Sequence, residues 1–294
     1  MNKPLLSISM ITYNQDKYIS EAIEGVLIQK TDFIIRLFIT DDNSLDNTAK
    51  ICQEYANKFP DLIDFESFSE NKGMMANWIY NLNKCSKSGA KYIAICEGDD
   101  YWTDPLKLQK QVDFLEANPE YSLCFHNAKI IYENKREKSR LFCKLEKNIF
   151  DLYDVIERNW FIPTQSIVFK RSYLNNIPEW FGYIFNGDLA LQLLLAAKGN
   201  FYYLNEVMSV YRKHATGISS KYLNSNIKLK IIEVLIYTNQ YLHFEYNKPI
   251  QKRINTLRGE LYKSLLYERK LFNRLLSIDF YLFKLKSLAK KIFN

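Results

Sequence analysis

Residues 91–100 read KYIAICEGDD, a stretch that changes from apolar to acidic half-way along. The first six residues form a short apolar run bounded by turn-forming residues, which predicts a buried strand. Three acids then fall within four residues, at Glu97, Asp99 and Asp100. Carboxylates this close repel one another, which raises at least one pKa unless a cation is present, and oxygen ligands suit a hard divalent metal. A solvated acidic turn is the alternative, which the other motifs of the chain disfavour.

Strand-like and helix-like patterns alternate over the first 130 residues. Strands are expected at residues 5–13, 33–40, 62–68, 91–96 and 121–125, and helices at 19–27, 46–58, 75–82 and 105–117. This alternation predicts an α/β fold, with a mostly parallel sheet flanked by helices. In such sheets ligands bind beyond the carboxyl ends of the strands. Polar clusters fall at three of those ends, which favours a ligand site over three unrelated solvated turns.

The rest of the chain predicts a second half and an extension. Residues 130–160 are expected to form a charged, irregular insertion, followed by a strand at 164–170, a helix at 188–197 and aromatic strands at 201–211. From about residue 221 the pattern is helical. We therefore expect one domain over residues 1–220, with halves at about 1–130 and 150–220, and a basic helical extension over 221–294.

Composition narrows the class of protein. The chain has 294 residues, of which 47% are hydrophobic and 25% charged, as in ordinary globular proteins. It has no apolar run of 18 residues and no basic start leading into an apolar core, which argues against a transmembrane helix or a secretory signal. Five widely spaced cysteines disfavour a disulfide framework or zinc site, so a cytoplasmic protein is the simpler inference.

The net charge of +7 is unevenly placed along the chain. Residues 221–294 carry 15 Lys and Arg against 5 Asp and Glu. From Lys263 onward, leucines and phenylalanines interleave with these cations, which predicts a basic amphipathic helix. Such a helix either makes peripheral contact with the inner face of the plasma membrane or packs on the rest of the chain or another subunit. The charge also suits nucleic acid, but no recognition motif accompanies it, and we expect no such partner.

Six motifs, in this order and spacing, resemble the family 2 glycosyltransferases, which are inverting enzymes of the GT-A fold. They are Thr12-Tyr13-Asn14 with Tyr18-Ile19-x-Glu21-Ala22-Ile23, Asp41-Asp42-Asn43-Ser44-x-Asp46-Asn47-Thr48, Asn71-Lys72-Gly73, Glu97-Gly98-Asp99-Asp100, Gly187-Asp188-Leu189 and Tyr211-Arg212-Lys213-His214. The resemblance covers roughly residues 5–220. It implies a GT-A (Rossmann-like) catalytic domain, with a nucleotide-sugar half followed by an acceptor half.

The activity that the resemblance implies is metal-dependent, hexosyltransferase-like sugar transfer. The donor would be a nucleotide-diphosphate sugar, expected to be a UDP-sugar, and the acceptor a hydroxyl of a glycan or lipid-linked glycan. Such enzymes serve bacterial cell-surface polysaccharide biosynthesis. The implied cofactor is Mg²⁺ or Mn²⁺, which bridges the two phosphates and stabilises charge on the leaving group.

The resemblance also implies roles for individual residues. Asp188 corresponds to the general base, although a helix N-cap is a second interpretation of this aspartate. Gly187 stands where relatives often carry an acid. The residues expected to bind the nucleotide sugar are Thr12, Tyr13, Asn14, Asp41, Asn71, Lys72, Asp99, Arg212 and His214. The expected metal ligands are Asp100, Asp99 and His214, with Asp100 binding the ion directly, although the motif begins with Glu97 where the family usually has an aspartate.

Other interpretations stay open at this point. A nucleotidyltransferase of similar fold would need a glycine-rich phosphate loop after the first strand, and the residues Thr12 to Gln15 do not resemble one. A sugar-nucleotide-binding module without turnover would not need the acids Asp99, Asp100 and Asp188. Trp102, Trp160, Phe161 and Trp180 offer flat faces for sugar rings, and core packing accounts for them equally well.

Overall fold

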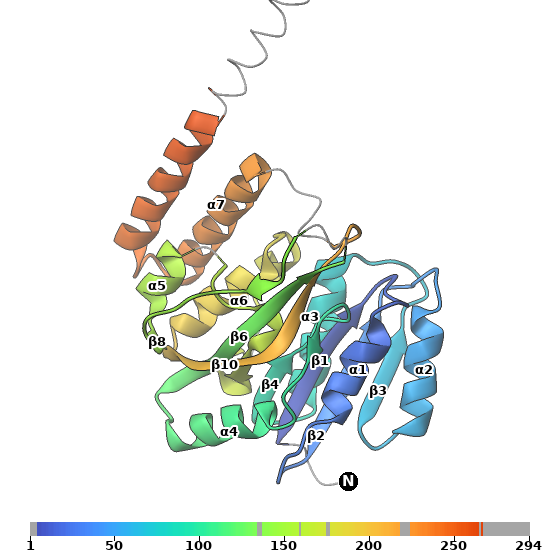
Figure 1. Ribbon diagram of the computed structural model, residues 1–294. Coiled ribbons are helices and arrows are strands. Elements are labelled where there is room, and N and C mark those ends of the chain that lie inside the picture. Colours follow the sequence, from blue (N-terminus) through green and yellow to red (C-terminus); the bar gives the residue numbers. More distant parts are fainter. Residues whose placement is uncertain are drawn as a thin grey trace, which may run out of the picture.

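The computed structural model describes residues 5–133, 137–158, 160–174, 177–217, 224–264 and 266 (Figure 1). Its strands are β1 (Leu6–Thr12), β2 (Ile35–Asp41), β3 (Ile63–Ser67), β4 (Tyr92–Ile95), β5 (Tyr101–Trp102), β6 (Tyr121–Tyr132), β7 (Arg140–Leu141), β8 (Ile149–Phe150), β9 (Val168–Lys170) and β10 (Asn200–Lys213). Its α-helices are α1 (Ile19–Leu27), α2 (Thr48–Lys58), α3 (Met74–Lys87), α4 (Lys107–Ala117), α5 (Leu152–Glu157), α6 (Gly187–Ala196) and α7 (Asn224–Tyr241). A further helical stretch covers 247–264.

The strands of the described chain form one sheet in the order β3-β2-β1-β4-β9-β6-β10-β5. Neighbours from β3 to β4 are parallel, and β9 runs antiparallel between β4 and β6. β10 is again parallel to β6. The short strand β7 pairs antiparallel with β6, and β8 pairs antiparallel with β10. The result is the expected mixed α/β architecture, with the carboxyl ends of β1, β2 and β4 at one edge.

Helices cover both faces of this sheet, so the central strands are buried on both sides. One apolar cluster joins the sheet to α1, α2 and α4 through residues such as Ile23 and Leu115. The other joins it to α3, α5, α6, α7 and the stretch 247–264 through residues such as Trp78, Leu193 and Ile254. Successive side chains of β4 point to opposite clusters, with Ile93 and Ile95 on one side and Ala94 on the other. This double burial explains the continuous apolar run in the sequence.

The second half of the sheet differs in detail from the prediction. The irregular insertion expected at 130–160 contains the end of β6, the strands β7 and β8, and helix α5, which has an Asp151–Asp154 capping box. The aromatic strands expected at 201–211 are one long strand, β10, whose register shifts around Val207. The polar residues Asn205 and Glu206 lie at this irregularity and mask the continuity of the strand. Residues 164–166 form a 3₁₀ turn before β9.

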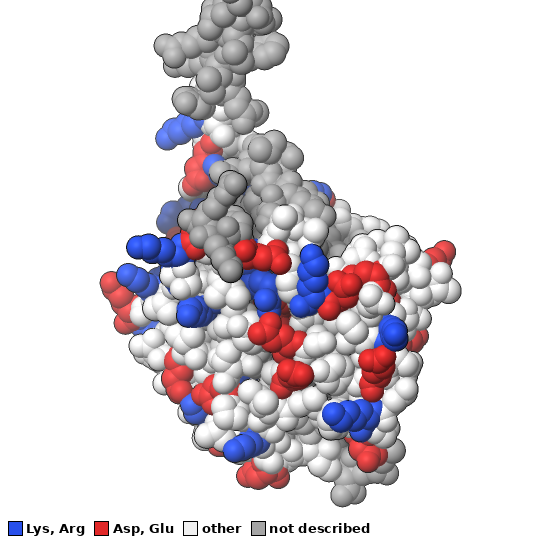
Figure 2. Space-filling view, turned by 45° about the vertical axis from the view of Figure 1, so that its right-hand side comes forward, with Lys and Arg blue, Asp and Glu red and all other residues white. Residues whose placement is uncertain are grey.

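The beginning of the basic extension packs on the rest of the fold. Ile231, Val234 and Leu235 of α7 are buried in the same cluster as α6, and so are Ile250 and Leu257 of the next helical stretch. Figure 2 shows acidic and basic side chains interspersed on the face drawn. Within the described residues, no helix is both long and apolar enough to span a bilayer. Most of the amphipathic segment expected from Lys263 onward lies outside the described residues.

Candidate active site

The acidic loop follows β4 and is tightly packed against the loop after β1. A Cβ added at Gly98 would lie 2.4 Å from Gln15 Oε1 and 3.1 Å from Thr12 Cβ. Real Cβ atoms do not approach other atoms that closely, so a larger residue at this position would have to displace the Gln15 side chain. The side-chain hydroxyl of Thr12 donates to Gln15 Oε1 at 2.7 Å, which fixes the facing side chain. The Glu97–Asp100 loop is thereby held against the first predicted nucleotide-binding segment.

The end of β10 holds the same acidic loop from the other side. The backbone N–H of Arg212 donates to Asp100 Oδ1 at 2.8 Å, and Arg212 Nε donates to the Asp99 carbonyl at 3.0 Å. Arg212 Nη2 lies 2.6 Å from a Glu21 carboxylate oxygen of α1, and the guanidinium sits over the rings of Tyr18 and Tyr101. In this structure the Arg212 fork therefore positions Asp99. A contact with a phosphate remains a prediction.

Asp99 and His214 form a carboxylate–imidazole pair. Asp99 Oδ2 lies 2.9 Å from His214 Nε2, and His214 Nδ1 lies 2.8 Å from Thr216 Oγ1. The imidazole also packs on the Tyr18 ring, with centroids 4.7 Å apart. Asp100, by contrast, is 1% exposed, and its Oδ2 has no hydrogen-bond partner among the described residues. Two of the predicted metal-binding side chains thus meet directly, and the third offers an unsatisfied buried oxygen beside them.

The charges of this loop are poorly compensated. Burial, together with the charges of Asp99 and Asp188, raises the pKa of Glu97 to about 8. Burial, Asp99 and Glu97 raise the pKa of Asp100 well above its usual range, against the opposing effect of Arg212. Burial also raises the pKa of Asp188, although hydrogen bonds from the Leu189 N–H and the Trp160 side chain oppose this. A nearby cation would lower all three pKa values.

The donor atoms present fit a divalent metal that is shared with a substrate. Within the described residues, no group of three or more His, Cys, Asp or Glu side chains is arranged to hold an ion alone. Mg²⁺ is usually held by one or two carboxylates plus substrate phosphates, without a complete protein cage. The Asp99–His214 pair and Asp100 Oδ2 match this incomplete donor set. The metal site is therefore a proposal based on donor chemistry.

The loops after β1 and β2 interlock. Asn14 adopts φ 52°, in the left-handed region that asparagine tolerates. Its backbone N–H donates to Ser44 Oγ at 2.8 Å, and its side-chain oxygen accepts from the Leu45 N–H at 2.8 Å. Tyr13, between Thr12 and Asn14, is 43% exposed. The predicted segments at 12–14 and 41–44 are thus brought together, with one aromatic ring open to solvent.

The two aspartates after β2 have different partners. Asp41 is fully buried, and its carboxylate accepts from the Ser44 N–H at 3.0 Å, from the Ser44 hydroxyl and from the Ser67 hydroxyl at 2.8 Å. Asp42 accepts from the backbone N–H groups of Lys72 and Gly73 at 2.7 and 2.9 Å. The Asn71 side chain donates to the Asp42 carbonyl at 3.0 Å. Asp42, which the sequence analysis did not single out, therefore joins the predicted segments at Asp41 and at 71–72.

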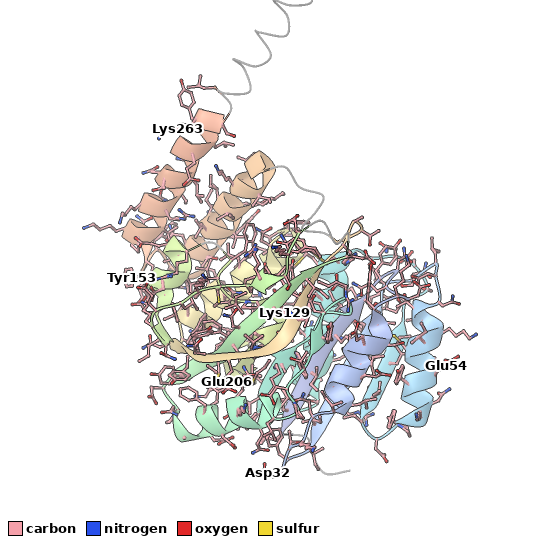
Figure 3. All side chains as sticks on the ribbon, viewed as in Figure 1. Asp32, Glu54, Lys129, Tyr153, Glu206 and Lys263 are labelled. Atoms are coloured by element: carbon pink, nitrogen blue, oxygen red, sulfur yellow. The ribbon has the colours of Figure 1, made fainter. Side chains whose placement is uncertain are left out.

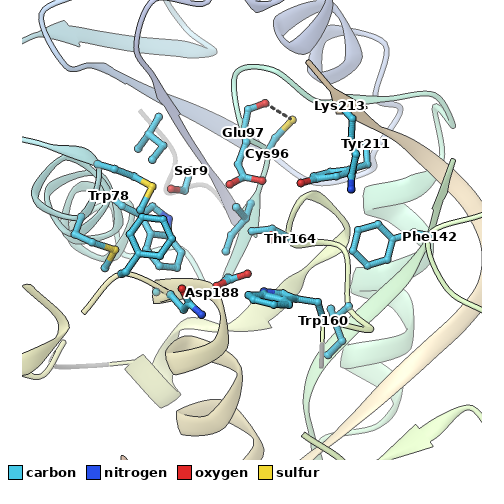
Figure 4. A pocket seen from close by; sticks show the side chains of 18 of the residues that line it. Ser9, Trp78, Cys96, Glu97, Phe142, Trp160, Thr164, Asp188, Tyr211 and Lys213 are labelled. Atoms are coloured by element: carbon cyan, nitrogen blue, oxygen red, sulfur yellow. Dashed lines mark hydrogen bonds between the residues drawn. The ribbon is translucent and has the colours of Figure 1, made fainter. Parts of the chain in front are cut away.

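A cavity of about 420 Å³ opens beside the acidic loop and contains Glu97 and Asp188 (Figure 4). Other side chains in its wall include Trp78, Phe142, Trp160, Thr164 and Tyr211. Of the four aromatics considered for sugar binding, Trp160 lines the cavity, whereas Trp102 and Phe161 are buried and Trp180 is packed against the core. The remaining predicted site residues lie outside this wall. The cavity brings together acids from the loop after β4 and from α6 that are far apart in the sequence.

Asp188 lies in the first turn of α6, and the N-cap residue of this helix is Asn186. The interpretation of Asp188 as the N-cap is therefore incorrect. Its Oδ1 accepts from the Leu189 N–H at 2.8 Å, where the helix dipole favours a carboxylate. A Cβ on the preceding Gly187 would come within 2.3 Å of the Trp78 ring and 2.7 Å of Met75. Close packing against α3 thus excludes the acid that relatives often carry at this position.

Comparison with known proteins identifies the family. The family model described as glycosyl transferase family 2 matches residues 7–177. The chain belongs to glycosyl transferase family 2. An uncharacterized protein of Mycobacterium tuberculosis is 40% identical over 215 residues, which are 72% of this chain and 60% of that protein. A dTDP-rhamnosyl transferase of Shigella flexneri is 24% identical over 298 residues, covering 97% of this chain and 96% of the relative.

Two solved structures share the fold. TarS of S. aureus in complex with UDP-GlcNAc matches with a TM-score of 0.61 at 18% identity, over 79% of this chain and 65% of that one. A mannosyltransferase of Pyrobaculum calidifontis, in complex with GDP-Man and Mn²⁺, matches with a TM-score of 0.56 at 15% identity, over 92% and 81% of the two chains. These likenesses confirm the GT-A fold expected from the motifs.

Proposed function

We propose that this chain transfers a sugar, with inversion, from a nucleotide-diphosphate donor to a hydroxyl of a glycan or lipid-linked acceptor in bacterial surface-polysaccharide synthesis. The observation that carries the proposal is the convergence of Glu97, from the loop after β4, and Asp188, from α6, in one cavity, with Asp99 of the Asp99–His214 pair on the same loop as Glu97. The cavity is within the size range of small-ligand sites. Structural neighbours bind UDP-GlcNAc and GDP-Man, and we propose a UDP-sugar as the donor here.

The nucleotide half of the site consists of the interlocked loops after β1 and β2 together with the 71–72 turn. Tyr13 offers an exposed ring for the base or ribose. Asp41 and Asp42 already accept several hydrogen bonds, which hold the loop after β2 against β3 and the 71–72 turn. We propose that the fully buried Asp41 shapes the nucleotide pocket from behind, through Ser44 and Ser67, and that Thr12, Asn14, Asn71 and Lys72 complete this pocket.

Asp99, His214 and Asp100 are the proposed ligands of Mg²⁺ or Mn²⁺. When bound, such an ion offsets the negative charge that develops on the leaving diphosphate. The sequence motifs lead us to expect that Asp100 binds the ion directly, but its side chain is buried, whereas that of Asp99 is 23% exposed. We therefore propose the direct contact for Asp99 and a supporting one for Asp100 Oδ2. Arg212 keeps Asp99 in place through its carbonyl.

Asp188 is the proposed general base for the acceptor hydroxyl. Its pKa is raised by burial, which brings it closer to the pH at which it would act, and a base is most effective when these values are close. The Leu189 N–H and the Trp160 side chain hold the carboxylate in one orientation. In a single displacement, Asp188 would receive the proton as the acceptor oxygen attacks the sugar.

A panel of nucleotide sugars with Mn²⁺ tests the proposal. A donor that binds only the folded chain raises its apparent stability, so thermal shift identifies the nucleotide, and nucleoside-diphosphate release in a metal-supplemented assay then measures turnover. Binding without release, in the presence of glycan acceptors, would favour the binding module. No binding by any nucleotide sugar would exclude the proposed function.

The basic extension is the proposed point of contact with the inner face of the plasma membrane, where a lipid-linked acceptor would be found. Deleting residues from about 263 onward is expected to abolish sedimentation with anionic liposomes, because it removes most of the interleaved cations and leucines. If the truncated chain sediments with the liposomes to the same extent as the full chain, the proposed membrane contact of the basic extension is wrong.

A further inference from the structure

One wall of the cavity is a row of residues across three strands. Tyr211 of β10 pairs with Ile130 of β6, and Ile130 pairs in turn with Arg140 of β7. All three residues line the cavity, as does Lys213, two positions beyond Tyr211 on the same strand. Residues two apart on a strand face the same side of the sheet. Arg140 and Lys213 therefore present two cations to the same space that holds Glu97 and Asp188.

These two cations have no anionic partner within the described residues. The Arg140 guanidinium donates to the Tyr132 hydroxyl at 3.2 Å and to the Leu141 carbonyl at 3.3 Å. Lys213 Nζ lies 5.9 Å from the centroid of the Tyr132 ring. Neither side chain takes part in an ion pair in the described part of the chain, whereas the nearby Arg212 is paired with Glu21. A guanidinium without a carboxylate at the mouth of a cavity is suited to a bidentate contact with an incoming anion.

The cavity carries cations and acids on different elements, with Arg140 and Lys213 on β7 and β10, and Glu97 and Asp188 on the loop after β4 and on α6. Within the described residues, no ion pair joins these cations to these acids. The cations are therefore available to a ligand that enters with its hydroxyl toward Asp188. Figure 4 shows Lys213 and Tyr211 on one side of the cavity and Asp188 on another.

The donor diphosphate is a poor candidate for these cations. The proposed diphosphate site is at Asp99 and His214, which lie 2.9 Å apart. Arg212, which contacts Asp99, faces the opposite side of β10 from Lys213. Arg140 is two strand spacings away from β10, at about 10 Å, because β6 lies between β7 and β10. An anion on the acceptor would reach this wall, and Phe142 and Tyr211, in edge-to-face contact at 5.4 Å, provide an apolar surface beside it.

We infer that the acceptor carries an anionic group, a phosphate or a carboxylate, close to its reacting hydroxyl, and that Arg140 and Lys213 bind this group. The inference rests on the proposed function and specifies the substrate class of the same site. It assigns Arg140 and Lys213 to acceptor specificity. The two sources of the anion, a glycan phosphate and a uronic acid, share the chemistry that a guanidinium recognises.

The test uses the full-length chain with UDP and Mn²⁺ present, titrated with matched pairs of small probes. One pair is methyl glucuronide and methyl glucoside, and the other is glycerol phosphate and glycerol. We expect the anionic member of at least one pair to bind about tenfold more tightly than its neutral partner, as for a charge-assisted contact at a partly open site. The pair that shows the preference identifies whether carboxylate or phosphate is recognised.

Variants separate this wall from general surface charge. Arg140→Gln and Lys213→Gln should each remove most of the preference, while the matched control Lys129→Gln, on the opposite face of β6 (Figure 3), should keep it. Equal binding of neutral and anionic probes, or an unchanged preference in both variants, would overturn the inference. A parallel loss of UDP affinity in Arg140→Gln would also overturn it and leave the proposed function intact. Failure of the wild-type chain to bind any nucleotide would instead count against the proposed function.

Discussion

Replacing Glu97 with glutamine should stabilise the metal-free protein, and the effect should depend on pH. Glu97 lies among Asp99 and Asp188, and its pKa is raised from an ordinary 4.5 to about 8. Below pH 4.5 the carboxyl is protonated in both the folded and the unfolded chain. Between pH 4.5 and 8 only the unfolded chain releases the proton, so rising pH favours unfolding. Glutamine has no proton to release and removes this penalty.

The size of the effect follows from the pKa. Each pKa unit corresponds to about 1.4 kcal/mol, which sets an upper limit of about 5 kcal/mol at pH 8. Because Glu97 faces the cavity and is partly solvated, we expect roughly half of this, on the order of 2–3 kcal/mol. For a chain of this size that corresponds to a rise in melting temperature of about 5–10 °C at pH 8. At pH 5 the two proteins should melt within a degree or two of each other.

The assay is thermal unfolding in EDTA at pH 5 and pH 8. Glu54→Gln on the exposed side of α2 (Figure 3) is the matched control, and it should change the melting temperature little at either pH. Parallel pH profiles for wild type and Glu97→Gln would refute the claim that the acid cluster lacks a compensating charge.

Two further substitutions test other parts of the site. Asp188→Asn should lower turnover by about 10²–10⁴-fold with donor affinity near normal, because it removes a proton acceptor and little donor contact; a defect confined to donor affinity would exclude the role as base. Gly187→Ala should lower the free energy of unfolding by about 1–3 kcal/mol in a urea titration, because the added Cβ would contact Trp78 and Met75. The control Gly182→Ala should be nearly neutral, because no atom lies within 4 Å of its added Cβ. Equal stability of the two variants would contradict the claim that Gly187 is tightly packed against α3.

Much of the first half of the fold could be predicted from local patterns. Of the four parallel strands, β4 is a continuous apolar run, whereas β1, β2 and β3 have polar residues among the apolar ones. Polar residues follow each of them, so both the elements and the edge that carries the site are visible in the sequence. The second half was less accessible. Strand β10 is interrupted by Asn205 and Glu206, and β5 has only two residues, which is too short for a periodic signal.

The sequence indicates which residues form the site, but not which of them contact one another. The pairing of Arg212 with Glu21 joins residues 191 positions apart, and no local signal indicates it. The different partners of Asp41 and Asp42 depend on which way each side chain points at the end of β2. The place of Glu97 in the cavity with Asp188 depends on the packing of α6 behind the sheet, which periodicity does not encode.

The central claim is that Asp99 and His214 bind a divalent cation together with a nucleoside diphosphate. Isothermal titration of UDP with and without Mn²⁺ tests it most directly. We expect Mn²⁺ to strengthen UDP binding at least tenfold in wild type. Asp99→Asn should lose this enhancement, while Asp32→Asn, at the opposite end of the sheet (Figure 3), should retain it. UDP binding that is indifferent to Mn²⁺, or an enhancement that survives Asp99→Asn, would contradict it.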